Sequence, residues 1–220
     1  MKIDLVIKVG GSLGHWHGVG SLLDSIARWR DRTTVLVVPG GGPFADLVRL
    51  AHRQWQLTES AAHRLAILAM DQYGLLLCGV ASRALPVDSL SSAGAVLRSG
   101  RLPIFLPSRT LFRRDPFSHS WNVTSDSIAA YIAGLARADA LVLLKDVDGI
   151  FAQDPKINLA APFLPHVARS RLGRYRCVDR EFAKWVRGIG SCWIVNGTRP
   201  DRVKEWLERG ETAGTCIRMR

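Results

Sequence analysis

Long apolar runs are missing from this chain of 220 residues. The longest candidate, residues 65–80, contains Asp71, Gln72 and Gly74, whereas a bilayer-spanning helix needs about 20 consecutive apolar residues. The amino-terminal segment also lacks the basic and apolar stretches of a signal peptide. We therefore expect a cytoplasmic protein with no membrane partner.

Cysteine is scarce, and its spacing argues against two further classes of protein. The four cysteines are widely separated and form no CxxC pair, so neither a cysteine-based zinc site nor a disulfide framework is expected. Cys78 and Cys192 stand among apolar residues and are expected to be buried thiols.

Two common catalytic signatures are also absent. The sequence contains no GxxxxGK[ST] and no GxGxxG. It therefore lacks the marks of a Walker-type nucleotide site and of a dinucleotide-binding fold.

Lysine is scarce although the chain is strongly basic. Lysine and arginine together number 30 against 19 acidic residues, a net charge of +11, yet only six of these cations are lysines. The positive charge is dispersed, with no basic block and no basic stripe interleaved with aromatics. We therefore expect an anionic small-molecule substrate rather than nucleic acid, whose binding would show a steep salt dependence.

Apolar runs alternate with stretches of helical periodicity. Strands are expected at residues 3–9, 34–38, 103–107, 140–144, 192–195 and 214–219, and helices at residues 19–30, 43–50, 58–81, 125–136, 179–187 and 200–207. The long helix at 58–81 has an uncertain start and a possible break at Gly74, and residues 108–120 are expected to form an exposed loop or hairpin. This alternation predicts an α/β fold with a mainly parallel sheet.

Two strand ends run into glycine. Lys8-Val9-Gly10-Gly11-Ser12 ends the first strand, and Gly40-Gly41-Gly42 joins the second strand to a helix that begins near Pro43. Glycine lets a ligand approach the main chain closely, and a helix amino terminus with free N–H groups attracts anions. A lysine beside such a turn suits phosphate.

Carboxylates cluster at two later junctions. Thr124-Ser125-Asp126-Ser127 opens a helix, where one of these residues is expected to cap the helix and Asp126 can hold lysine side chains or bind Mg²⁺. Lys145-Asp146-Val147-Asp148-Gly149 follows the most buried strand, and Asp154-Pro155-Lys156 comes shortly after. Ligands of open α/β sheets bind beyond the carboxyl ends of the strands, so both junctions are candidate site segments.

In order along the chain, the motifs are KVGGS at 8–12, PGGG at 39–42, Ser125-Asp126, DVDGI at 146–150 with Asp154-Pro155, Asn196-Gly197 and Gly214-Thr215. This ordered set resembles the amino-acid kinase superfamily over nearly the whole chain. Within it, residues 42–49, 120–127 and 177–179 are most similar to the small kinases of methanofuran biosynthesis. Those enzymes phosphorylate (5-(aminomethyl)furan-3-yl)methyl phosphate to its diphosphate.

The resemblance implies a fold, a reaction and roles for particular residues. The fold is a single domain, 1–220, built as a three-layer α/β sandwich, with an acceptor-binding and oligomerisation lobe at 1–120 and a nucleotide-binding lobe at 121–220. The reaction is transfer of the γ-phosphoryl group of ATP, with Mg²⁺ carried by ATP rather than by a protein ligand. The implied residues are Lys8, Asp126 and Lys145 as catalytic, Gly10, Gly11 and Ser12 as phosphate-binding, Gly40, Gly41, Gly42, Asp46, Asn122 and Thr124 as acceptor-binding, and Asp146, Asp148, Gly149, Asp154 and Lys156 as nucleotide-binding. A homodimer or larger homo-oligomer is implied as well.

Two departures from the family pattern qualify these expectations. Many members supply a second catalytic lysine from a Gly-Met-x-x-Lys stretch, which this chain lacks, and we expect Lys145, or else Lys184, to replace it. Asp46 stands where related isopentenyl phosphate kinases have a histidine, and we infer that it pairs with the cationic aminomethyl group. The alternatives are a uridylate, isopentenyl phosphate, acetylglutamate or carbamate kinase-like enzyme, or a non-catalytic nucleotide- or oxyanion-binding protein.

Overall fold

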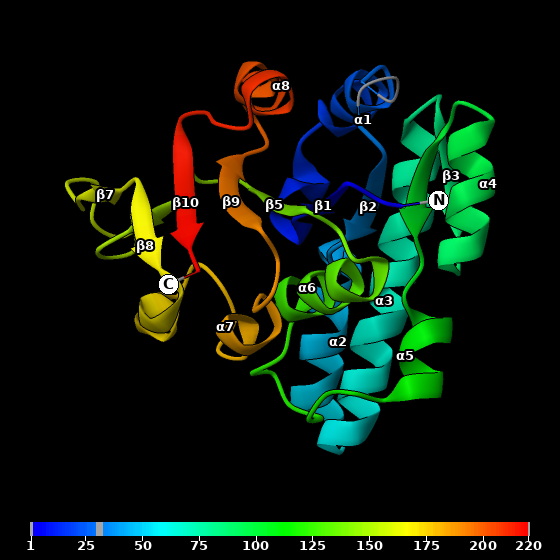
Figure 1. Ribbon diagram of the computed structural model, residues 1–220. Coiled ribbons are helices and arrows are strands. Elements are labelled where there is room, and N and C mark those ends of the chain that lie inside the picture. Colours follow the sequence, from blue (N-terminus) through cyan, green and yellow to red (C-terminus); the bar gives the residue numbers. More distant parts are fainter. Residues whose placement is uncertain (1, 30–32, 220) are drawn as a thin grey trace.

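The computed structural model describes residues 2–29 and 33–219 (Figure 1). Met1 and Arg220, at the ends of the expected domain, and Arg30, at the end of the first expected helix, lie outside the described residues. In the described part of the chain, no helix is long and apolar enough to cross a membrane.

A central eight-stranded sheet organises the molecule. Its strands are β1 (Leu5–Val9), β2 (Val35–Pro39), β3 (Ala84–Val87), β4 (Leu102–Phe105), β5 (Ala140–Lys145), β8 (His166–Ala168), β9 (Ser191–Asn196) and β10 (Gly214–Arg218). They lie in the order β3-β4-β2-β1-β5-β9-β10-β8, and all neighbours pair in parallel except β9 and β10. The expected α/β class with a mainly parallel sheet is confirmed.

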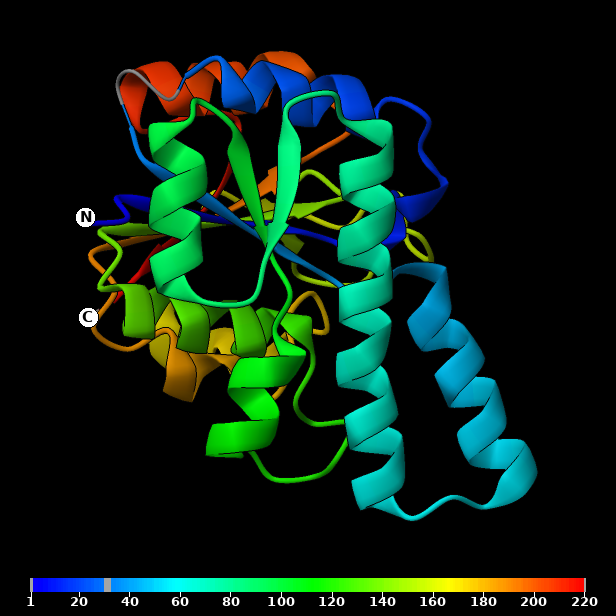
Figure 2. The ribbon, with the colours of Figure 1, turned by 90° about the vertical axis from the view of Figure 1, so that its right-hand side faces the viewer.

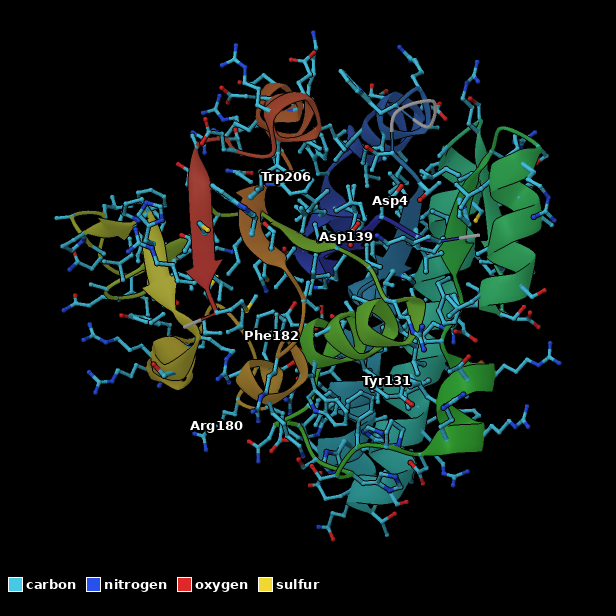
Figure 3. The ribbon with its side chains drawn as sticks, in the orientation of Figure 1. Asp4, Tyr131, Asp139, Arg180, Phe182 and Trp206 are labelled. Carbon is cyan, nitrogen blue, oxygen red and sulfur yellow. The ribbon has the colours of Figure 1, made fainter. Side chains whose placement is uncertain are left out.

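Helices cover both faces of this sheet (Figure 1, Figure 2). One face carries α1 (Val19–Ala27) and α8 (Pro200–Arg209), and the other carries α6 (Ser125–Ala136) and the short α7 (Phe182–Trp185). Trp206 of α8 and Phe182 of α7 belong to the two separate apolar cores on these faces (Figure 3). The three layers expected from the sequence are therefore present.

Helices α3 (Glu59–Val80) and α4 (Leu90–Arg98) flank the sheet edge at β3 (Figure 2). Helix α2 (Gly42–Trp55) packs against α3. Helix α3 is continuous through Gly74, where an added Cβ would lie 2.7 Å from a methyl carbon of Leu106. The glycine thus lets α3 pack closely on the sheet instead of breaking it, and the side chain of Thr58 caps the helix by accepting a hydrogen bond from the Ala61 N–H (3.2 Å).

The expectation of a loop or hairpin at 108–120 is wrong over its first half. Residues Ser108–Arg114 form a helix, α5, whose exposed arginines accompany a buried Leu111. Asp71 of α3 accepts hydrogen bonds from the N–H and the hydroxyl of Ser108. Because this cap comes from a residue 37 positions away, local sequence gives no start signal for the helix.

Other boundaries also differ from the sequence expectation. In the expected helix at 179–187 only Phe182–Trp185 is helical, and the Asp179 side chain before it bonds to the start of α6. The sequence pattern predicts none of β3, α4 and β8, nor the small hairpin of β6 (Ile150–Phe151) and β7 (Phe163–Leu164). Cys192 is buried as expected, whereas Cys78 is half-buried.

Candidate active site

The candidate site lies where the carboxyl ends of β1 and β5 meet the amino termini of α2 and α6. A pocket of about 800 Å³ opens there. At the opposite end of these strands, Figure 3 shows Asp4 and Asp139 side by side, joined by a backbone hydrogen bond of 2.9 Å. The pocket therefore occupies the edge at which parallel sheets bind ligands.

The alternation of side chains along β1 and β5 places two lysines on the sheet face that packs against α6. Val6 of β1 and Leu143 of β5 belong to the core beneath α6, and side chains two residues apart share a face of a sheet. Lys8 and Lys145 follow two residues after them and therefore also face α6. The scarcity of lysine in this chain makes the convergence of two of them on one point notable in itself.

Both lysines bind one carboxylate, Asp126, in the first turn of α6. Lys8 Nζ lies 2.8 Å from Asp126 Oδ1, and Lys145 Nζ lies 2.8 Å from Asp126 Oδ2. Lys8 and Asp126 are only 4% and 3% exposed. Asp126 therefore fixes two ammonium groups side by side on the floor of the pocket.

The charge state of this trio follows from burial and mutual attraction. Burial alone raises the pKa of the Asp126 carboxyl, but Lys145 and Lys8 outweigh it and hold that pKa at about 2. Burial lowers the pKa of the Lys8 ammonium, and Lys145 adds to this effect while Asp126 opposes it. Burial also disfavours the charge of Lys145, but Asp126 outweighs this and raises its pKa. Asp126 is thus a permanent anion and an unsuitable general base at neutral pH.

Acidification should expose the contribution of Asp126 to stability. Its folded pKa of about 2 lies below its ordinary value of about 3.9, so its stabilising effect is present above pH ~4 and is lost as the pH falls through ~2. The shift corresponds to about 2–3 kcal/mol. Denaturant unfolding from pH 5 to 2 should show a shallower loss of stability in Asp126→Asn than in the wild type, and parallel curves would contradict this assignment.

Asp179 holds the start of α6 in place. Its carboxylate accepts hydrogen bonds from the N–H and hydroxyl of Thr124 (2.9 and 2.8 Å) and from the N–H and hydroxyl of Ser127 (3.0 and 2.5 Å). These bonds flank Asp126 on both sides. Sequence reasoning missed this role, because residues 177–179 were noted only for their resemblance.

The two glycine turns pack against each other beside the lysines. A Cβ added at Gly40 would lie 2.6 Å from the Gly11 nitrogen, and one at Gly11 would lie 2.8 Å from the Gly42 nitrogen. Gly42 also has a φ of +55°, which only glycine adopts readily. Close backbone packing therefore explains these glycines in part. Gly10, Gly11, Ser12, Gly41 and Gly42 line the pocket, whereas Gly40 lies outside its lining.

The expected nucleotide side is formed mainly by the segment after β5. Lys156 Nζ lies 2.5 Å from Asp146 Oδ2. Burial raises the pKa of Asp146, but hydrogen bonds from Lys156 and Ser12 outweigh it and lower that pKa. Gly149, Asp154 and Lys156 also line the pocket. Asp148 does not, because it binds Asn196 (2.8 Å) and Arg202 (2.7 Å).

The expected acceptor side is incomplete in the pocket lining. Asp46 and Thr124 line it, but Asn122 does not. Asp46 is exposed and pairs with Arg49 (2.7 Å), whose guanidinium lies 4.9 Å from the Trp121 ring centre. A small apolar recess adjoins this region, lined by Ile67, Met70, Trp121 and Ile128 among others.

Of the two candidates for a second lysine, only Lys145 reaches Asp126. Lys184 is largely exposed and lies 3.5 Å from Glu181, outside the pocket lining. Arg174 and Arg176 do line the pocket, and sequence reasoning missed them because no strand end or glycine turn marks them.

Buried ammonium groups, glycine turns and two helix amino termini around one pocket have the chemistry that phosphoryl transfer on an α/β scaffold requires. A model of the amino acid kinase family matches residues 5–184. The chain belongs to this family and is an ATP-dependent kinase.

Curated relatives and solved structures agree with the family. [5-(Aminomethyl)furan-3-yl]methyl phosphate kinase of Methanocaldococcus jannaschii is 29% identical over 206 residues, which cover 92% of both chains. Glutamate 5-kinase of Polaromonas naphthalenivorans is 25% identical over 256 residues, covering 97% of this chain and 66% of that protein. Uridylate kinase of Archaeoglobus fulgidus superposes with a TM-score of 0.74 at 22% identity, over 99% of this chain and 100% of that one. An isopentenyl phosphate kinase substrate complex gives 0.66 at 20% identity, over 97% and 100%.

Proposed function

We propose that this kinase transfers the γ-phosphoryl group of MgATP to the phosphate of [5-(aminomethyl)furan-3-yl]methyl phosphate, giving the diphosphate. The similarity to the Methanocaldococcus kinase along 92% of both chains is the observation that carries this proposal. A phosphate acceptor also suits the site, since the second pKa of a phosphate monoester is near 6 and the acceptor is already anionic at neutral pH. No general base is needed, which fits the ion-paired Asp126.

Under this proposal the chain's own residues position and neutralise phosphates. Lys8 and Lys145 offset the charge of the transferring group, while Gly11 and Ser12 present backbone donors beside them. The Gly10 N–H is not among these donors, because it bonds to the Leu144 carbonyl (2.9 Å). Both oxygens of Asp126 are engaged by lysines, and Asp146 is engaged by Lys156. We therefore propose that Mg²⁺ arrives on the ATP phosphates and that no carboxylate of this floor serves as its principal ligand.

We assign the acceptor to the lobe formed by residues 1–120 and the nucleotide to residues 121–220. The pocket spans both, with Gly41 and Asp46 on one side and Asp146 and Lys156 on the other. The cytoplasm, where ATP is made and used, is the location this proposal requires.

Asp46 is proposed to recognise the ammonium of the acceptor, displacing Arg49 from its carboxylate. Loss of a charge-assisted hydrogen bond of about 1.5–3 kcal/mol in Asp46→Asn should raise the KM for the amine-bearing acceptor roughly 10- to 100-fold and leave the KM for ATP nearly unchanged. Asp88→Asn, which disrupts a similar exposed pair with Arg109, is the matched control. Equal increases in both KM values would contradict this role.

A substrate panel separates this function from its alternatives. Uridine monophosphate, isopentenyl phosphate, N-acetylglutamate, glutamate and carbamate should support much slower ADP formation than the aminomethylfuran phosphate. A non-catalytic binding protein would form no ADP with any of them. Fastest turnover of another acceptor would transfer the proposal to that substrate.

We propose a homodimer through the outer face of α3. Leu65, Leu68 and Leu75 are 39%, 40% and 52% exposed, and their spacing places them on one stripe of the helix. Exposed apolar stripes of this kind mark association surfaces, and a two-fold axis sets the same patch against itself.

Leu68→Glu should therefore weaken self-association. Two like charges buried across a symmetric interface should raise the dimer Kd at least ~100-fold, as measured by analytical ultracentrifugation. Leu159→Glu, at an exposed position outside α3, should leave association unchanged. A dimer that tolerates both changes equally would place the interface elsewhere.

A further inference from the structure

A second cluster of ligating side chains lies away from the lysine pair. His63 of α3, Asp115 at the end of α5 and His119 in the following loop offer ligand atoms that all lie within 4.8 Å of one another. Two imidazoles and one carboxylate are a donor set that zinc prefers. We propose that these three residues form a zinc site that joins α3 to the α5–α6 connection.

His119 is already oriented by neighbours as metal-binding histidines are. Its Nδ1 lies 2.7 Å from the Ser60 hydroxyl, and its Nε2 lies 2.9 Å from Asp115 Oδ1. With Nδ1–H donating to Ser60, Nε2 is free to bind a metal, and Ser60 fixes the tautomer and the ring. Zinc would then replace the direct His119–Asp115 hydrogen bond.

His63 supplies a neutral ligand from the interior. It is 7% exposed, and its ring stacks on that of His119 with centroids 4.6 Å apart. Metal binding requires the neutral imidazole, in which one ring nitrogen is free to bind the ion.

Asp115 caps the carboxyl end of α5. Its φ of +40° lies in the left-handed region that helix C-cap residues commonly adopt. Tetrahedral zinc places its ligand atoms roughly 3.3–3.5 Å apart, so small side-chain rotations bring the three groups to bonding distance. Water fills the fourth position.

A neighbouring positive charge, that of Arg64, should weaken zinc binding, so its removal should raise the zinc affinity. The positive charge of Arg64 acts on both His63 and Asp115, so Arg64→Gln should tighten zinc binding. The consequence for the enzyme lies nearby, because the loop that carries His119 continues into Trp121 and Thr124. Zinc would restrain this segment.

The test uses tag-free full-length protein, stripped with chelator and titrated with Zn²⁺ against a chromophoric competitor. We expect one zinc per chain, a rise in Tm, and the visible spectrum of tetrahedral Co²⁺ on cobalt substitution. His119→Ala and Asp115→Asn should each weaken binding at least ~10-fold, and Ser60→Ala about 10-fold through the lost orientation of His119. His166→Ala, at an exposed position of β8, and Cys177→Ser, in the lysine pocket, should bind as the wild type does.

Wild-type affinity in both His119→Ala and Asp115→Asn would overturn the site, as would equal loss in His166→Ala or Cys177→Ser. The titration is repeated with Lys8→Ala, which should bind zinc as the wild type does. Zinc binding is thus tested independently of the kinase reaction and of the identity of the acceptor.

Discussion

Lys8→Ala lowers kcat at least ~100-fold, the magnitude typical of removing one group that stabilises a transition state. The lysine is buried on β1 and held in place by Asp126. A water molecule that filled the space left by its side chain would not supply the same oriented positive charge. ATP binding should persist through the remaining contacts of the nucleotide segment. Steady-state kinetics together with a nucleotide-binding titration measures both quantities.

Lys2→Ala is the matched control for this change. Lys2 lies just before the same strand but pairs with Asp139 in an exposed position, at the end of the sheet away from the pocket. It should retain wild-type kcat. An active Lys8→Ala enzyme with an unchanged Tm would refute the proposed role of Lys8.

Lys145→Ala should cause a loss of similar size. Lys145 donates to Asp126 Oδ2 at 2.8 Å, and its removal leaves one ammonium where phosphoryl transfer between two anions needs charge compensation from both sides. The effect should appear mainly in kcat, since the charge is most needed as the phosphoryl group leaves ATP. Single-turnover kinetics separates this step from product release.

Lys184→Ala decides between the two candidates for the second lysine. Lys184 is 68% exposed, pairs with Glu181 and lies outside the pocket lining, so its loss should leave kcat close to the wild-type value. Full activity in Lys145→Ala combined with a large loss in Lys184→Ala would reverse the assignment. Loss in neither variant would leave Lys8 as the single essential lysine and would contradict the paired arrangement.

The parts of the fold that follow from local pattern were predictable. The glycine turns after Lys8 and before Pro43 are visible in the sequence, as is the buried strand before Lys145. Strand alternation already places Lys8 on the face of Val6. Asp126 connects these segments by binding both lysines. Its position in the first turn of a helix was also visible in the sequence.

The parts that depend on distant partners were not predictable. Helix α5 is capped by Asp71, and the start of α6 is held by Asp179, more than fifty residues along the chain. The sequence around Asp71 and around Asp179 gives no signal that predicts these hydrogen bonds. Asp148 was expected to bind the nucleotide, but its carboxylate is bound by Asn196 and Arg202 and lies outside the pocket lining. Helix starts and side-chain contacts that depend on residues distant in the sequence were therefore not predictable from local patterns.

The most direct test of the central claim is a ³¹P NMR time course with ATP, Mg²⁺ and [5-(aminomethyl)furan-3-yl]methyl phosphate. We predict that wild-type enzyme converts the acceptor phosphate into diphosphate resonances with equimolar ADP, and that Lys8→Ala and Lys145→Ala each slow this conversion at least ~100-fold. Formation of ADP with inorganic phosphate alone, or unchanged rates in both lysine variants, would contradict it.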